Sequence, residues 1–88
     1  MVEFKSRVNN KIGLHLRAAG EFVKLAAKFS SKITVIKNAR SANGKSILGL
    51  ASLAVGRGST IIIQIEGEDE VEARRAIEEL INDNFYEE

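Results

Sequence analysis

The chain has 88 residues, with 13 basic side chains, 12 acidic side chains and no cysteine, and 44% of it is hydrophobic. This length predicts one domain, 1–88, with no second core. The absence of cysteine excludes disulfides, thiolate metal ligands and cysteine nucleophiles, and a net charge of +1 is not typical of a nucleic-acid-binding protein. Because we find neither a signal-peptide pattern nor a membrane-spanning stretch, we expect a cytoplasmic protein without membrane insertion.

The N-terminal half alternates strand-like and helix-like patterns. Residues 2–8 place side chains suited to a core at every second position, which predicts a strand with one solvated face. The apolar residues then follow helical spacing, which predicts a helix over about 16–28. A second strand is predicted over 32–37, followed by the turn Asn38-Ala39 and a short edge strand over 40–42.

The next segment contains a turn, a short helix and a strand. Asn43-Gly44 predicts the turn, and Ser46 is placed to cap a short helix that ends near residue 53. Residues 60–66 place isoleucine at alternate positions, so we expect a strand there with one face in the core.

The last segment predicts a third helix. Asp69 and Glu72 have the spacing of a capping box, in which each side chain accepts a hydrogen bond from a free amide of the first turn. We expect the helix to end before Tyr86. Its expected buried residues are Val71, Ala73, Ile77, Leu80 and Ile81.

The predicted order of elements is β-α-β-β-α-β-α. The second and third strands are joined too tightly for a crossover, so they are expected to pair antiparallel. The pattern therefore predicts an α+β fold, an open-faced β-sandwich with a four-stranded antiparallel sheet and three helices on one face.

His15 is the one histidine of the chain and falls at the predicted start of the first helix. A lone histidine is more often a surface or capping residue, but here its surroundings suit an anion. Amides of a first helical turn lack partners within the helix, and the helix dipole disfavours a protonated imidazole there. The same amides would favour a phosphoryl group on the ring, and Arg17 can hold phosphate oxygens. No second histidine or paired carboxylate is predicted beside them, so we expect neither hydrolysis nor a metal site.

Ser46 is the second candidate. A serine at this position usually serves only as a helix cap, which contributes about 1 kcal/mol, but a phosphate there would also meet free amides. Leu50 and Leu53 account for the inner face of the short helix. The remaining apolar residues are expected to point outward and to form a docking surface. They are Ile47, Leu48 and Ala51.

Two segments resemble signatures of a known family. Gly13-Leu14-His15-Leu16-Arg17-Ala18-Ala19 is similar to the active-site signature G-L-H-A-R-P-A of HPr, the histidine-containing phosphocarrier of the bacterial phosphotransferase system. Asn43-Gly44-Lys45-Ser46-Ile47-Leu48-Gly49-Leu50 resembles the family's regulatory-serine site, and the resemblance covers essentially the whole chain. Ala18 replaces the family's proline, and because alanine is a good helix former we expect the fold to be retained.

The resemblance implies a relay of phosphoryl groups. His15 would accept the group on Nδ1 from phosphorylated enzyme I, whose donor is phosphoenolpyruvate, and pass it to IIA domains of sugar permeases, while Arg17 steadies the phosphate. Ser46 would be the target of an HPr kinase/phosphorylase, and the resulting form a corepressor of a catabolite-control transcription factor. The protein would be a monomeric carrier without cofactor or turnover of its own. Its expected partner-binding residues are Leu16, Ile47, Leu48 and Ala51.

Two alternatives stay open at this stage. One is a regulator that acts mainly through Ser46, and nitrogen-related or dihydroxyacetone-kinase relays are variants of the carrier hypothesis. The other is a small-molecule-binding or RNA-binding α+β domain. An RNA-binding sheet needs aromatic residues on its open face, whereas three of the five aromatic residues here have core spacing and two lie near the C-terminal end.

Overall fold

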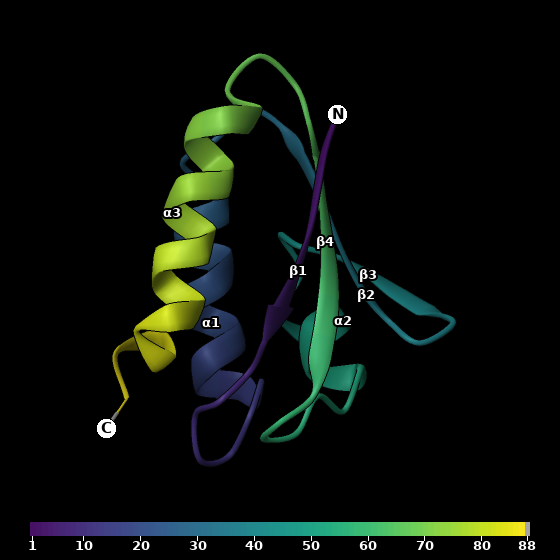
Figure 1. Cartoon of the computed structure of the whole chain (residues 1–88), viewed down its shortest axis with the longest axis vertical. Coiled ribbons are helices and arrows are strands. Elements are labelled where there is room, and N and C mark those ends of the chain that lie inside the picture. Colours follow the sequence, from purple (N-terminus) through teal and green to yellow (C-terminus); the bar gives the residue numbers. More distant parts are fainter. Residues whose placement is uncertain (88) are drawn as a thin grey trace.

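The computed structural model describes residues 1–87 (Figure 1). Glu88, which follows the predicted end of the last helix, lies outside the described residues. The elements are β1 Val2–Arg7, α1 Leu16–Ala26, β2 Lys32–Lys37, β3 Arg40–Asn43, α2 Ile47–Ser52, β4 Thr60–Glu66, α3 Glu70–Asn82 and the 3₁₀ turn η1 Asn84–Tyr86. The predicted order is confirmed, and α1 ends two residues earlier than the spacing suggested.

The four strands form one antiparallel sheet in the order β1-β4-β2-β3. At its centre, Ile63 of β4 pairs with Phe4 of β1 and with Val35 of β2. All three side chains are buried, so the alternating pattern aligns across the strands into one apolar face. Helices α1 and α3 lie on the same side of the sheet in Figure 1, and the predicted α+β open-faced sandwich is confirmed.

The core lies between this sheet face and the helices. The inward residues Ile61, Ile63 and Ile65 of β4 are fully buried, and α1 contributes Phe22 and Ala19 from its apolar stripe. Within residues 1–87, no helix combines the length and apolar character needed to cross a membrane.

The start of α3 differs from the prediction. Asp69 precedes the helix but makes no capping hydrogen bond. Its carboxylate instead accepts hydrogen bonds from the amides of Ser30 (2.9 Å) and Ser31 (3.0 Å) and from the Ser31 hydroxyl. The predicted capping box with Glu72 is therefore wrong, because the loop between α1 and β2 offers donors that compete for the Asp69 side chain. The hydrogen bonds from Ser31 and Ser30 hold the pKa of Asp69 below its ordinary value.

The predicted buried face of α3 is correct except at Val71. Ala73, Ile77, Leu80 and Ile81 are buried, but Val71 is 62% exposed. Val71 lies two residues before Ala73, which is about 200° around an α-helix. It therefore points away from the core in which the other four side chains are buried.

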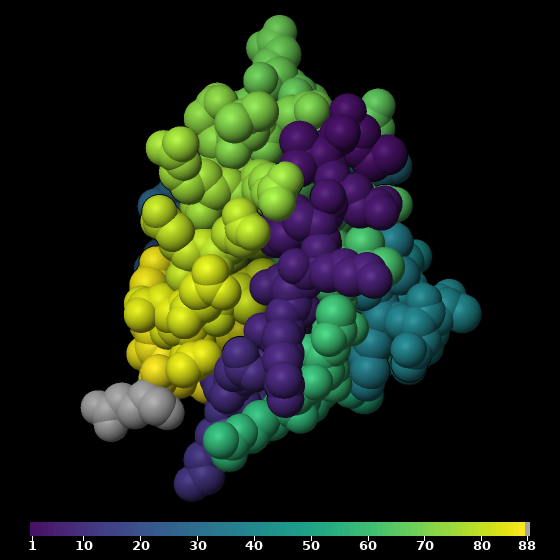
Figure 2. Space-filling view, in the orientation of Figure 1, coloured from purple at the N-terminus to yellow at the C-terminus, as the bar shows by residue number. Residues whose placement is uncertain are grey.

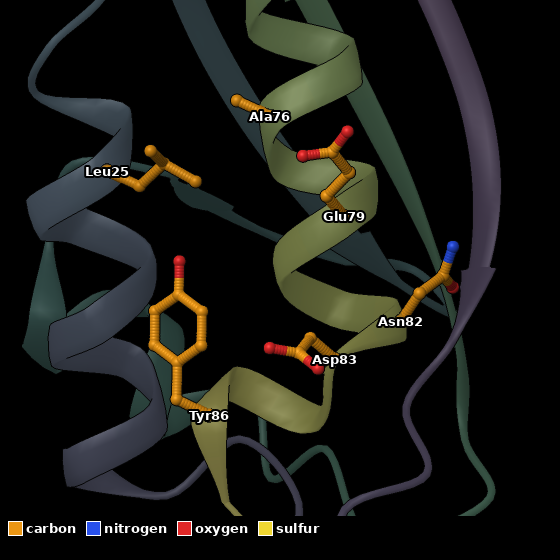
Figure 3. Close-up of a pocket in the computed structure, with 6 residues that line it drawn as sticks. All are labelled: Leu25, Ala76, Glu79, Asn82, Asp83 and Tyr86. Carbon is orange, nitrogen blue, oxygen red and sulfur yellow. The ribbon is translucent and has the colours of Figure 1, made fainter.

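α3 ends at Asn82, before Tyr86 as predicted. The chain then turns back through η1, where Asn84, Phe85 and Tyr86 have φ of 54°, 56° and 64°. Such left-handed backbone costs about 1 kcal/mol or more for each non-glycine residue. The Phe85 side chain is completely buried, which offsets about 1.5–3 kcal/mol of that cost. The Tyr86 ring stands between α3 and α1 (Figure 3), so this C-terminal segment is held against both helices.

Candidate functional site

His15 occupies the predicted position at the start of α1. It is the N-cap residue, and its backbone carbonyl accepts a hydrogen bond from the Ala19 amide (2.8 Å). Its side chain makes no capping hydrogen bond, so the ring is not committed to the helix. The side chain is 29% exposed. The imidazole is therefore reachable from solvent beside amides that have no partner within the helix.

The loop before His15 is pinned by a close backbone approach. The Leu14 amide donates a hydrogen bond to the Val55 carbonyl (2.8 Å), and the Leu14 side chain is buried. Gly13 has φ +79°, and a Cβ at this position would lie 2.2 Å from the Val55 oxygen. Only glycine satisfies both the left-handed backbone and the space available, which explains why this residue precedes the histidine.

A third side chain, Glu87, completes the cluster. Its Oε2 atom lies 2.8 Å from Nε2 of His15 and 3.1 Å from Nη1 of Arg17, and its Oε1 accepts a hydrogen bond from Nδ2 of Asn10 (2.9 Å). The structure thus brings His15 and Arg17 together, as predicted, but through a carboxylate that sequence reasoning missed. Figure 2 shows the C-terminal segment, in yellow, packed beside the N-terminal segment, in purple.

The electrostatics of the cluster favour an anion. Burial alone raises the pKa of Glu87, but hydrogen bonds from Asn10, His15 and Arg17 outweigh it. The pKa of Glu87 is therefore held below its ordinary value of 4.5. The carboxylate is ionised at neutral pH, and it lies between Nε2 of the imidazole and the Arg17 guanidinium.

Ser46 lies outside this cluster, as the N-cap of α2. Its Oγ accepts a hydrogen bond from the Gly49 amide (3.0 Å), so the predicted cap is confirmed. A Cβ on residue 49 would lie 3.0 Å from this Oγ, and glycine there leaves room for the capping hydroxyl.

The predicted apolar patch is largely exposed. Leu50 and Leu53 are buried on the inner side of α2, whereas Leu48 is 77% exposed and Ile47 is 42% exposed. Leu16, on the first turn of α1, is 60% exposed, and α1 packs against α2. Ala51 is half-buried. These four residues, Leu16, Ile47, Leu48 and Ala51, are called the apolar patch below.

A groove of about 490 Å³ lies between α1 and α3, away from these residues (Figure 3). Its lining residues are Leu25, Ala76, Glu79, Asn82, Asp83 and Tyr86. Neither His15 nor Arg17 is among them. The candidate site is therefore a surface cluster that a partner protein can approach, distinct from the groove.

Comparisons with known proteins identify the family. The family model described as the PTS HPr component phosphorylation site matches residues 2–83. The phosphocarrier protein HPr of Neisseria meningitidis serogroup A is 44% identical over 87 residues, which cover 99% of this chain and 98% of that protein. The HPr-like protein Crh of Halalkalibacterium halodurans is 48% identical over 77 residues, covering 88% and 92%. The crystal structure of HPr-C-His from Thermoanaerobacter tengcongensis has a TM-score of 0.95 and 45% identity, covering 100% of this chain and 99% of that chain. The resemblance is confirmed, and the chain belongs to the HPr family of phosphocarrier proteins of the phosphotransferase system.

Proposed function

We propose that His15 carries the phosphoryl group, that the group comes from phosphorylated enzyme I, and that it passes to IIA domains of sugar permeases. One observation supports this most directly: the exposed imidazole lies at the start of α1, and an ionised carboxylate already bridges it to the Arg17 guanidinium. The carboxylate contacts Nε2, so Nδ1 is left for a phosphoryl group, whose oxygens the guanidinium can hold.

The chemistry is an in-line displacement between two imidazoles. The lone pair on Nδ1 of His15 forms a bond to phosphorus while the bond from phosphorus to the donor nitrogen breaks, and the donor ring keeps that electron pair. Free amides of the first turn and the Arg17 guanidinium stabilise the charge on the phosphoryl oxygens. In the second transfer, a nitrogen of the acceptor protein forms the bond to phosphorus and His15 keeps the electron pair of the bond that breaks. Chain 1–88 would act as one monomeric cytoplasmic domain that carries the group without a cofactor or turnover of its own.

The apolar patch is the surface on which enzyme I and IIA domains dock. Leu48 and Leu16 expose most of their side chains, and exposed apolar residues beside a polar reacting group are typical of an interface core. The patch includes Leu16, which directly follows His15 at the start of α1, so docking would bring the partner's imidazole toward this ring.

Ser46 is proposed as the regulatory phosphorylation site, modified by an HPr kinase/phosphorylase. A phosphate on its Oγ would still meet the first-turn amides of α2, so the domain would stay folded. The added charge would lie next to Ile47 in the apolar patch and would weaken docking on enzyme I. The same modified form would serve as corepressor for a catabolite-control transcription factor.

Incubation with enzyme I and phosphoenolpyruvate tests the carrier proposal. We expect acid-labile phosphate on His15, its loss in His15→Ala, its retention in Ser46→Ala, and slower transfer in Arg17→Ala. Phosphorus NMR distinguishes a phosphoramidate from a phosphate ester. If only ATP and a kinase load the protein, with acid-stable phosphate on Ser46, the regulator alternative replaces the carrier proposal.

A further inference from the structure

The contact between Glu87 and His15 determines which ring nitrogen carries the hydrogen. An ionised carboxylate can only accept hydrogen bonds, and Oε2 of Glu87 lies 2.8 Å from Nε2 of His15. Nε2 must therefore be the donor in this contact. In a neutral imidazole, the other nitrogen then holds the lone pair, so Nδ1 is the nucleophilic atom of the ring.

The Glu87 carboxylate is itself held in place. Nδ2 of Asn10 donates to Oε1 of Glu87 (2.9 Å) and to the Gly13 carbonyl (2.7 Å), and the Asn10 side chain is buried. Nη1 of Arg17 donates to Oε2 (3.1 Å). The Glu87 side chain is only 16% exposed, and the buried Phe85 ring anchors the turn two residues before it. A freely moving tail would not keep this geometry.

We propose that Glu87 is a positioning residue for phosphoryl transfer, which orients the His15 ring and presents Nδ1 to the incoming phosphorus. This inference rests on the proposed function of His15. The family-model match ends at residue 83, so Glu87 lies outside the matched segment.

The same carboxylate acts on the charge of the reacting ring. When Nδ1 forms a bond to phosphorus and Nε2 keeps its hydrogen, the ring becomes cationic. A carboxylate that accepts the Nε2–H bond stabilises this cation more strongly than it stabilises the neutral ring. Losing a hydrogen bond to a charged group corresponds to about tenfold or more in rate.

The first test reads the ring in the unphosphorylated protein, so its result does not depend on phosphoryl transfer. Nitrogen-15 NMR of His15 reports the tautomer in the wild type, in Glu87→Ala and in Glu87→Gln. We expect hydrogen on Nε2 in the wild type and a mixture of both tautomers in Glu87→Ala. Glu87→Gln keeps an acceptor oxygen and should restore the wild-type tautomer.

The control is Glu68→Ala, which removes one acidic side chain from the β4–α3 loop at the opposite end of the molecule (Figure 1). It should leave both the tautomer and the transfer rate unchanged. Thermal unfolding of each variant verifies that the fold is retained.

The second test uses phosphoramidate, a small donor that needs no docking surface, alongside phosphorylated enzyme I. With both donors we expect Glu87→Ala to accept phosphate about tenfold more slowly, and Glu87→Gln to lie between it and the wild type because the amide lacks the charge. A mixture of products in Glu87→Ala, some with phosphate on Nδ1 and others with phosphate on Nε2, would further support the inference.

An unchanged tautomer and rate in Glu87→Ala would overturn the inference, and so would faster acceptance from phosphoramidate, which would make Glu87 an obstacle to the phosphoryl group. Failure of the proposed function is distinguishable from these results: the wild type would then show the Nε2–H tautomer but would take no phosphate from enzyme I.

Discussion

Replacing Gly13 by alanine should destabilise the domain and move His15, because the backbone before the histidine leaves no room for a Cβ. The left-handed φ of +79° costs an alanine about 1–2 kcal/mol. A Cβ 2.2 Å from the Val55 oxygen must also open the hydrogen bond from Leu14 to Val55, and an unpaired buried group costs about 1–3 kcal/mol. The total is about 2–5 kcal/mol, which for a domain of this size lowers Tm by at least about 8 °C.

Gly20→Ala makes the same chemical change with the opposite expected sign. Gly20 lies inside α1, and a Cβ there would meet nothing within 4 Å. Alanine is favoured over glycine in a helix interior by about 1 kcal/mol, so Tm should rise by about 4–8 °C. The pair therefore separates the geometry of the loop from any general effect of an added methyl group.

Thermal unfolding followed by circular dichroism at neutral pH compares the two variants with the wild type. The proposed phosphate uptake by His15 provides a second readout, which Gly13→Ala should impair and Gly20→Ala should not. An unchanged Tm for Gly13→Ala would refute the reasoning, because it would mean that the loop accommodates the Cβ without losing its contact with Val55.

Three further predictions concern stability. Ser46→Ala should lower the free energy of unfolding by about 1 kcal/mol through loss of the α2 cap, and equal urea midpoints for variant and wild type would contradict this. Phe85→Ala should lower the free energy of unfolding by about 3 kcal/mol or more, because the ring is fully buried. It should also expose the C-terminal segment to carboxypeptidase, and a variant as resistant as the wild type would contradict the anchoring role of Phe85. The pKa of Asp69 and of Glu87 lies below the ordinary values of 3.8 and 4.5, so the stabilisation is present above those values and is lost as the pH falls through the lower folded-state values. Urea unfolding across this pH range should show that the free energy of unfolding falls less steeply with acid in Asp69→Asn than in the wild type. Equal pH dependence in the two proteins would show that the hydrogen bonds of Asp69 contribute nothing to stability.

The elements were predictable where one local pattern decides the structure. Alternate isoleucines over 60–66 predict β4 because every second side chain of a strand meets the same face. The start of α1 was predictable for a related reason, since Gly13 follows the end of the strand pattern and the apolar residues take up helical spacing after His15. In both places the residues that interact are within a few positions of one another, so the sequence carries the signal directly.

Apart from Val71, the differences concern contacts between distant segments. Asp69 pairs with the loop at Ser31, 38 residues away, and Glu87 reaches His15 across 72 residues. No local pattern specifies such a partner, because tertiary packing decides which loop comes within reach. Phe85 is different: Ile77, Ile81 and Phe85 are spaced four apart, which predicts one helical face, so its burial could have been inferred although the helix itself ends earlier.

The proposed site combines a fixed backbone with side chains that solvent can reach, and the two properties have separate sources. Leu14 and Phe85 are buried and anchor the two segments that meet there, whereas His15 and Arg17 keep 29% and 56% of their side chains exposed. The proposed transfer between two proteins would need both properties, because a second imidazole would have to approach in line while the first holds its orientation. A buried histidine would be oriented but unreachable, and a histidine on a mobile loop would be reachable but unoriented. The start of a helix, held by residues on either side of the reacting pair, meets both requirements.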